Sequence, residues 1–264
     1  MTQHMFFEGR GFPIVERPAD EFWWHSTPLP NGVRTKSRQA WQECQFSMWD
    51  AISSATPDGF VGKTVLDIGA ADGFFSIAAA ASGASRVDAI DIAYVGWPVN
   101  LGFLSQQWKL PVNIITGDFR GHEFESGYDV IFFLGVLYHI EDVFRAFKVL
   151  HDLLNPRGRV IIETQVSQRD GEYPMLEMAS DFLPSTVGQG IEAIDNTGVS
   201  NFLIPNKLAI YQLAHMYRFK CGESIKCAYT DDYPLRRFFV LEKLADGLPR
   251  WDPRDVAGGD ASKN

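Results

Sequence analysis

The residues with the clearest potential for chemistry lie in the segment VLDIGAADGFFSI, residues 65–77. The segment reads as a short apolar strand, a turn marked by glycines and the start of a helix, a unit that usually holds a nucleotide-like ligand. In the turn, residues 69–73, Ala71 stands where a dinucleotide-binding fingerprint has its middle glycine, and Asp67 ends the strand before it. A carboxylate at that place favours a cationic group over a pyrophosphate. We therefore expect a ligand with positive charge near this glycine turn.

Further signals follow at intervals that suit one ligand-binding edge of a sheet. Asp91 ends the next expected strand, eighteen residues after Gly73, where a carboxylate can accept hydrogen bonds from both ribose hydroxyls. Asp118 and Phe119 follow the third expected strand, where they would meet an adenine. S-adenosylmethionine combines an adenine and a ribose with a sulfonium and an ammonium group, so it fits these positions. The residues that we expect to bind it are Asp67, Gly69, Ala70, Gly73, Asp91, Ile92, Asp118, Phe119, Leu134 and Gly135.

The elements that must position these residues alternate along the chain. Apolar or alternating runs predict strands at residues 64–69, 86–92, 112–118, 128–136 and 159–165, and periodic runs predict helices at residues 37–55, 74–82, 100–110 and 140–155. A helix with Pro205 near its start is predicted over residues 205–219, and two further strands over residues 221–231 and 236–244. Repeated βα units of this kind predict an α/β fold, namely a Rossmann-like, doubly wound, mostly parallel, seven-stranded sheet.

The order of these elements suggests one domain with three appended segments. Residues 1–36 form an N-terminal arm that we interpret as a lid, and residues 37–246 form the main domain. Residues from about 166 to 201 lose the βα pattern and read as an insertion after the fifth strand. The polar residues 247–264 read as a C-terminal tail.

Bulk composition narrows the classes of partner. The chain has 264 residues, 45% of them hydrophobic, and a net charge of -9, which disfavours a nucleic-acid partner unless a local basic patch exists. Three cysteines without a secretory signal predict reduced thiols in a cytoplasmic protein, and no metal-ligand spacing is visible. No apolar run is long enough to predict a membrane span.

The ordered motifs over about residues 63–164 resemble those of class I S-adenosylmethionine-dependent methyltransferases. A closer resemblance is to the family of carboxymethyluridine-forming tRNA methyltransferases and its relatives, and it is carried by GVLYH, followed by IIET and then NFLIPN. In the arm, the segment WWHSTPLPNGVRT resembles one that is common in those relatives. The tRNA enzymes use carboxy-S-adenosylmethionine. Where their pattern has an Arg-Tyr pair, this chain has Ile194 and Asp195, and where it has two arginines, this chain has Ile140 and Glu141. These departures remove cations that a carboxylated cofactor would need. We therefore expect plain S-adenosylmethionine.

The candidate catalytic residues are His139, Glu163 and His25. His139 follows the fourth strand, and an imidazole with an ordinary pKa near 6.5 suits proton removal at neutral pH. The alternative interpretation of His139 is a histidine at the end of a strand that packs and forms hydrogen bonds within the fold. For His25 the alternative is an aromatic plug that only closes the site. For Glu163 the alternative is an ion pair with Arg159 or with a residue of the tail. We expect Trp24, Tyr138 and Asn201 to bind the acceptor.

The leading prediction for function is methylation of a small-molecule acceptor, most simply on oxygen, in secondary or cell-envelope metabolism. The first alternative is a tRNA wobble-uridine-modifying methyltransferase, which needs a basic stripe seeded by Arg34, Lys36, Arg38, Arg236 and Arg237. The second alternative is a catalytically silent module that binds the cofactor. The oligomeric state is left open.

Overall fold

A seven-stranded sheet forms the centre of the protein. The computed structural model describes residues 2–15, 23–37, 44–92, 97–125, 127–169, 172–178, 202–222, 225 and 227–244. The sheet has the order β11-β12-β8-β7-β4-β5-β6, with β4 (Thr64–Ile68), β5 (Arg86–Asp91), β6 (Asn113–Thr116), β7 (Tyr128–Leu134), β8 (Leu154–Gln165), β11 (Phe219–Cys221) and β12 (Arg236–Lys243). Strands β4 to β8 pair in parallel, whereas β11 and β12 pair antiparallel at one edge. The predicted Rossmann-like, mostly parallel sheet is confirmed.

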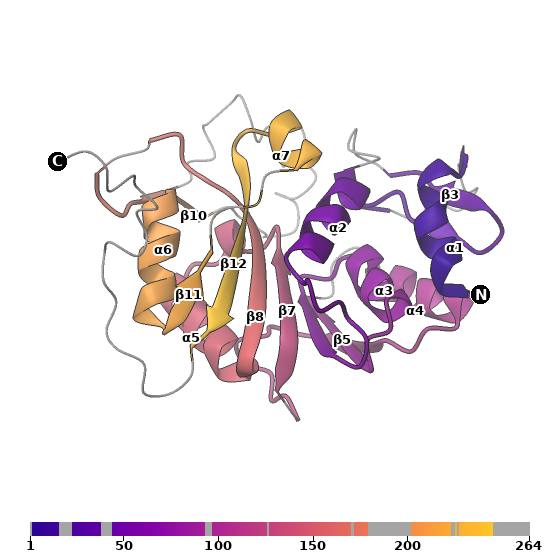
Figure 1. Ribbon diagram of the computed structural model, residues 1–264, viewed down its shortest axis with the longest axis horizontal. Coiled ribbons are helices and arrows are strands. Elements are labelled where there is room, and N and C mark those ends of the chain that lie inside the picture. The colour runs from indigo at the N-terminus through magenta and orange to yellow at the C-terminus, as the bar shows by residue number, and fades with distance from the viewer. Residues whose placement is uncertain are drawn as a thin grey trace.

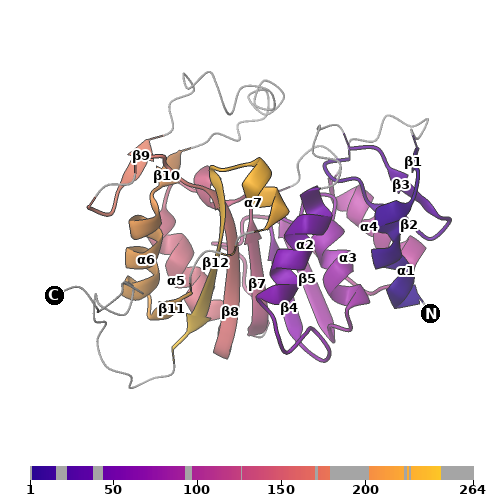
Figure 2. The ribbon, with the colours of Figure 1, turned by 45° about the horizontal axis from the view of Figure 1, so that its top comes forward.

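Helices cover both faces of the sheet (Figure 1, Figure 2). One face carries α2 (Cys44–Ser54), α3 (Phe74–Ala81) and α4 (Trp97–Trp108), and the other carries α5 (Val143–Leu153) and α6 (Lys207–Met216). Val65 and Phe132 pack into the core under the first group of helices, and their neighbours Leu66 and Phe133 pack into the core under the second. Successive side chains of a strand point to opposite faces, so the unbroken apolar runs of β4 and β7 are what a doubly covered sheet requires.

The N-terminal arm has regular structure that the sequence did not predict. It contains α1 (Thr2–Glu8), a 3-10 turn η1 (Gly9–Gly11), and a small sheet of β1 (Ile14–Val15), β2 (Pro28–Leu29) and β3 (Val33–Thr35) in the order β1-β3-β2. Strands of two or three residues are too short to show an alternating pattern. The ring of Phe6 lies 5.4 Å from the rings of both Phe74 and Trp108, which packs the arm against α3 and α4.

The last third of the chain differs from its prediction in two places. The predicted strand over residues 221–231 is wrong from residue 228 onward, because residues 228–232 form a helix, α7 (Ala228–Asp232), although Ile225 still pairs with Phe238 of β12. The main-chain N–H of Cys227 donates to Thr230 Oγ1 at 3.0 Å, and Thr230 Oγ1 donates back to the Cys227 carbonyl, which starts the helix. Pro205 ends a strand, β10 (Leu203–Pro205), instead of opening α6, whose first turn is capped by Asn206.

Strand β8 is also longer than predicted, because it begins at Leu154 and runs through residues 156–158, which lie between the predicted helix and the predicted strand. Arg157 takes a φ of 63°, and the pairing of β8 with β7 shifts register between Tyr128 and Val130. The segment is therefore an irregular start of the strand.

A two-stranded sheet lies beside the end of β7. It is formed by β9 (Leu176–Met178) and β10, which pair antiparallel. The main-chain N–H of Phe202 donates to the carbonyl of Tyr138 at 2.8 Å, so the residue directly after the insertion lies beside the residues that follow β7. Asn201 and residues 247–264 lie outside the described residues. No helix within the described ranges is both long and apolar enough to cross a membrane.

Candidate cofactor and acceptor site

The glycine turn between β4 and α3 has an unusual backbone. Gly69, Ala71 and Gly73 have φ values of 73°, 49° and 87°. A Cβ on Gly69 would lie 2.4 Å from Val136 Cγ2, and a Cβ on Gly73 would lie 2.2 Å from Leu101 Cδ1. Glycine is therefore required at both ends of the turn by conformation and by space. Ala71 holds a left-handed conformation, which is energetically unfavourable for any residue that has a Cβ.

A buried carboxylate and a half-buried carboxylate lie against this turn. Asp67, at 2% exposure, accepts a hydrogen bond from Ser76 Oγ at 2.6 Å, and Asp91 Oδ2 accepts one from the Ala71 N–H at 2.8 Å. Burial raises the pKa of Asp67 to about 6, against the lowering effect of the Ser76 hydrogen bond. Burial also raises the pKa of Asp91 to about 7, although the Ala71 hydrogen bond opposes it and the nearby Asp67 adds to it.

These raised pKa values fit a cationic ligand. Two carboxylates in a poorly solvated region stabilise a positive charge more than they would in water. S-adenosylmethionine brings an ammonium and a sulfonium group, so the donor set at the turn suits it. Ala70 is buried inside the turn, while Ile92, next to Asp91, is 48% exposed.

A third acidic residue, Asp72, lies within the turn itself and contacts the N-terminal arm. Its side chain is fully buried, and its Oδ2 accepts the main-chain N–H of His25 at 2.7 Å while its Oδ1 lies 2.5 Å from His25 Nδ1. The His25 ring packs edge-on against Phe75 at 5.4 Å. Trp24, beside it, lies against the ring of Trp97 at 6.2 Å. Asp72 was absent from the residues predicted from sequence, although it sits inside the quoted turn.

The next strand ends hold Asp118 and Phe119. The Asp118 carboxylate bonds to Arg120, with Nη2 at 2.6 Å from Oδ2, and this hydrogen bond lowers the pKa of Asp118. Phe119 is buried, with its ring 5.6 Å from that of Phe133. The N–H of Gly117 donates to the Asp91 carbonyl at 2.8 Å, so this turn lies beside the Asp91 main chain.

Residues at the end of β7 contact those at the end of β8. Leu134 ends β7, and the N–H of Gly135 donates to the Glu163 carbonyl at 2.9 Å. Tyr138 and His139 follow in a 3-10 turn, η2 (Leu137–His139), with ring centroids 4.4 Å apart. Gly135 has a φ of 71°, and a Cβ there would lie 3.3 Å from Tyr138 Oη.

Glu163 forms a buried ion pair with Arg236 of the neighbouring strand β12. Its two oxygens accept from Arg236 Nε and Nη2, each at 2.6 Å, and Tyr229 Oη donates to Oε1 at 3.3 Å. Arg236 Nη2 also donates to Tyr138 Oη at 3.3 Å, and its guanidinium carbon lies 4.9 Å from the centroid of the Tyr138 ring. Arg159 was the alternative partner predicted for Glu163, but its Nε lies 3.7 Å from Glu242 Oε2 instead. From the sequence, Arg236 was considered only as part of a basic stripe, because the antiparallel pairing of β12 with β8 that brings it to Glu163 is visible only in the fold.

Two of the five proposed seeds of a basic stripe, Arg34 and Arg236, are held by other groups of the protein. Arg34 is 5% exposed, with its Nε donating to the Phe12 carbonyl at 3.0 Å, and Arg236 is held by Glu163. Lys36 is exposed and Arg237 is half-buried, while Arg38 lies outside the described residues.

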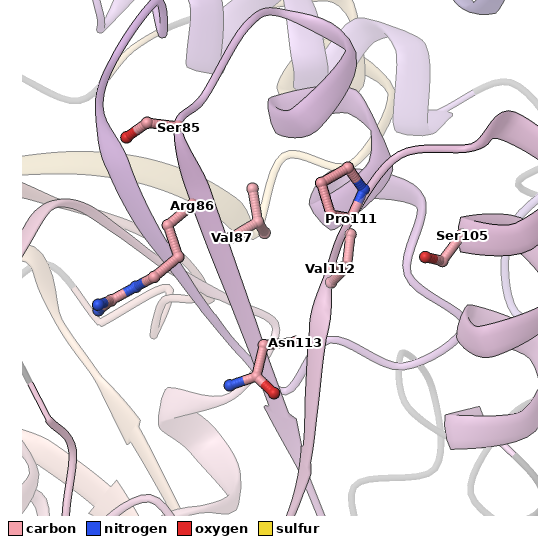
Figure 3. Close-up of a pocket in the computed structure, with 7 residues that line it drawn as sticks. All are labelled: Ser85, Arg86, Val87, Ser105, Pro111, Val112 and Asn113. Carbon is pink, nitrogen blue, oxygen red and sulfur yellow. The ribbon is translucent and has the colours of Figure 1, made fainter.

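A separate groove of about 340 Å³ lies at the opposite end of the sheet (Figure 3). It is lined at the starts of β5 and β6 by Ser85, Arg86, Val87, Pro111, Val112 and Asn113. Ser85 Oγ donates to the Gly62 carbonyl and Asn113 Nδ2 to Asp88 Oδ1, so polar groups of this groove already bond within the protein. It shares no residue with the glycine turn.

The described residues contain no group of three or more His, Cys, Asp or Glu side chains placed to hold a metal ion. Cys44, Cys221 and Cys227 are free thiols.

The fold and the turn are those of a methyltransferase, and the comparisons with known proteins agree. The chain belongs to the methyltransferase domain family, whose model matches residues 38–196. Together with the fold, this membership makes it a class I methyltransferase that uses S-adenosylmethionine as its cofactor.

Curated relatives include enzymes with different acceptors. The chain is 26% identical over 156 residues to a tRNA U34 carboxymethyltransferase of Campylobacter curvus, covering 53% of this chain and 51% of the relative. It is 29% identical over 133 residues to a ubiquinone biosynthesis O-methyltransferase of Aeromonas salmonicida, covering 50% and 55%. The chain thus spans about half the length of these relatives.

Solved structures support the fold. A 1,6-didemethyltoxoflavin-N1-methyltransferase of Burkholderia thailandensis, with S-adenosylhomocysteine bound, superposes with a TM-score of 0.55 at 17% identity, covering 76% of this chain and 83% of that one. The magnesium protoporphyrin IX methyltransferase of Synechocystis PCC 6803 gives 0.53 at 16% identity, covering 75% and 82%.

Proposed function

We propose that this methyltransferase acts on a small-molecule acceptor, most simply on an oxygen nucleophile, in secondary or cell-envelope metabolism. One observation carries the proposal: of the arginines that an RNA-binding stripe would need at the surface, Arg34 is buried, and Arg236, whose side chain is 14% exposed, is held by Glu163. Phosphate recognition depends on accessible cations, and the net charge of -9 adds to the difficulty. The similarity to the ubiquinone biosynthesis O-methyltransferase supports the same choice.

The cofactor-binding residues that we propose surround the glycine turn. Asp91 would accept hydrogen bonds from the ribose hydroxyls, and Asp67 would favour the cationic methionine moiety. Gly69, Ala70 and Gly73 would allow the close approach of the backbone. On either side, the adenine would meet Ile92, Asp118 and Phe119, and the methyl group would lie near Leu134 and Gly135.

Methyl transfer is an in-line displacement for which the bound cofactor supplies both the methyl group and the leaving group. The chain would position the acceptor, exclude water and take up a proton from an oxygen acceptor. We propose His139 as the proton acceptor and His25 as its rival. Both oxygens of Glu163 are engaged by Arg236, which favours a role for Glu163 as a charge partner over its predicted role as a base.

The acceptor side would be formed by Tyr138, with Trp24 of the arm and Asn201 of the insertion. This assignment treats residues 1–36 and about 166–201 as additions that complete the site on the main domain, residues 37–246. Aromatic and apolar side chains of this kind usually line sites for small ligands.

Methyl-labelled S-adenosylmethionine tests the proposal. The purified protein is incubated with total tRNA and, separately, with the small-molecule extract of its own host. Label that enters the extract supports the proposal, and mass spectrometry then identifies the product. Label that enters tRNA supports the second candidate, which the tRNA U34 carboxymethyltransferase relative favours. Tight cofactor binding without any transfer would instead indicate a silent module.

A further inference from the structure

The contact between Asp72 and His25 joins the N-terminal arm to the glycine turn. Both oxygens of a fully buried carboxylate face one residue, through the His25 main-chain N–H at 2.7 Å and Nδ1 at 2.5 Å. A carboxylate can only accept, so Nδ1 must carry the proton in this pair. Buried carboxylates are costly unless they are paired, so the arm provides what Asp72 needs.

The turn needs such contacts because its backbone is strained. Ala71, next to Asp72, has a φ of 49°, which a residue with a side chain rarely adopts. A strained conformation persists only when its surroundings determine it. Two side-chain contacts do so here on consecutive residues: Asp91 accepts the Ala71 N–H, and Asp72 is held by His25.

His25 is itself fixed in the arm. Its carbonyl accepts a hydrogen bond from Thr35 Oγ1 at 3.1 Å, and Thr35 Oγ1 accepts the Thr27 N–H at 2.8 Å. The Pro28 carbonyl accepts from Trp108 Nε1 of α4 at 3.0 Å, so the strand that follows His25 is tied to the main domain. Helix α1 accordingly lies beside α3, and β2 lies beside α4 (Figure 2).

We propose that His25 and Asp72 form a positioning pair, through which the N-terminal arm holds the glycine turn in the conformation that binds the cofactor. The arm then forms a fixed part of the cofactor site, and His25 acts by donating a hydrogen bond from Nδ1 to Asp72. This inference rests on the proposed function only in placing the cofactor at the glycine turn. A lid or a catalytic base at His25 would depend on different atoms, which makes the alternatives separable.

Two substitutions of His25 separate these roles. His25→Asn keeps an N–H donor near the position of Nδ1, whereas His25→Gln places its donor nearer the position of Nε2. Arg10→Met is the matched control, because Arg10 joins the arm to Asp50 of α2 at 2.8 Å through an exposed ion pair away from the turn. The probe is S-adenosylhomocysteine, measured by calorimetry for its dissociation constant and by intrinsic fluorescence for its dissociation rate. This ligand needs no acceptor.

We expect His25→Gln and His25→Ala to weaken binding about tenfold and to speed dissociation in proportion, the usual effect of losing one buried charge-assisted hydrogen bond. His25→Asn should bind within about threefold of the unchanged protein, and Arg10→Met should bind equally well. If His25→Ala fails to fold, the contrast between Asn and Gln still decides. Equal affinity and equal dissociation rates for Asn and Gln would overturn the positioning pair. Failure of the unchanged protein to bind S-adenosylhomocysteine would overturn the placement of the cofactor, and with it this inference.

Discussion

Asp91 at the end of β5 accepts the Ala71 N–H at 2.8 Å, so one carboxylate supports the glycine turn and stands where a ribose would bind. A carboxylate can accept several hydrogen bonds, so Asp91 can accept the Ala71 N–H at Oδ2 and still accept from a ribose. The strand end and the turn would therefore act as one unit in the cofactor site that we propose. Several measurable consequences come from this relationship and from the ion pair at the end of β8.

Replacing Asp91 should weaken cofactor binding strongly. Asp91→Ala removes the acceptor for the ribose hydroxyls and the support for the Ala71 N–H, so we expect a loss of affinity of about tenfold or more. Calorimetric titration with S-adenosylhomocysteine measures it, and Asp50→Ala provides the comparison, because the Asp50 carboxylate forms an exposed ion pair with Arg10 away from the turn. Unchanged affinity for Asp91→Ala would refute the ribose assignment.

Cofactor binding should depend on pH. In the ligand-free protein, burial raises the pKa of Asp91 to about 7 and that of Asp67 to about 6. A cationic ligand favours the ionised carboxylates, so binding should release protons, and affinity should rise with pH between about 5.5 and 8. Titrations in two buffers of different ionisation enthalpy report the released protons. Asp91→Asn should remove most of this dependence, and proton uptake on binding would contradict it.

The same two carboxylates should affect the stability of the ligand-free protein. Their pKa is raised in the folded state, so the native protein holds more protons than the unfolded chain between about pH 4 and pH 7. Their contribution to stability is therefore present at low pH and is lost as the pH rises through about 6 to 7. Urea unfolding of the unchanged protein and of Asp91→Asn across this window gives the difference. A contribution that grows with rising pH would have the wrong sign.

Ala71→Gly should stabilise the protein slightly. Removing the Cβ relieves a left-handed conformation that costs about 1–2 kcal/mol, while glycine adds roughly 0.5–1 kcal/mol of entropy loss on folding. The expected net gain in the free energy of unfolding is about 0.5–1 kcal/mol. Chemical denaturation measures it, with Ala70→Gly as the control, because Ala70 is not among the residues with positive φ. A loss of stability at position 71 as large as at position 70 would contradict the strain.

Breaking the ion pair at the end of β8 should cost stability as well as activity. Glu163→Gln leaves the buried Arg236 without a charged partner, which typically costs about 3–5 kcal/mol. A double-mutant cycle of Glu163→Gln with Arg236→Met should show a large coupling energy in urea unfolding. If Glu163 were instead a free catalytic base, its loss would reduce methyl transfer with little change in stability.

The sequence predicted most of the central sheet, because its strands carry long apolar runs and lie in regular βα order. It failed where local pattern carries little information. The arm strands span two or three residues, and α7 begins through contacts between Cys227 and Thr230 inside a segment rich in strand formers. Its span was therefore misread as a strand.

The candidate site shows the same division. Asp67, Asp91 and the glycines of the turn could be predicted as site residues because their places follow from the order of strands and turns. The partners of the site could not be found in this way, because they come from distant parts of the chain. His25 meets Asp72 across 47 residues, and Arg236 meets Glu163 across 73. Which side chains neutralise each other depends on packing that a linear pattern does not encode.

The crystal structure of the protein with S-adenosylhomocysteine tests the central claim most directly. We expect both ribose hydroxyls within about 3 Å of the Asp91 carboxylate, the adenine beside Ile92, and His25 still bonded to Asp72. A ligand bound elsewhere, or a ribose that does not contact Asp91, would contradict the account of this site.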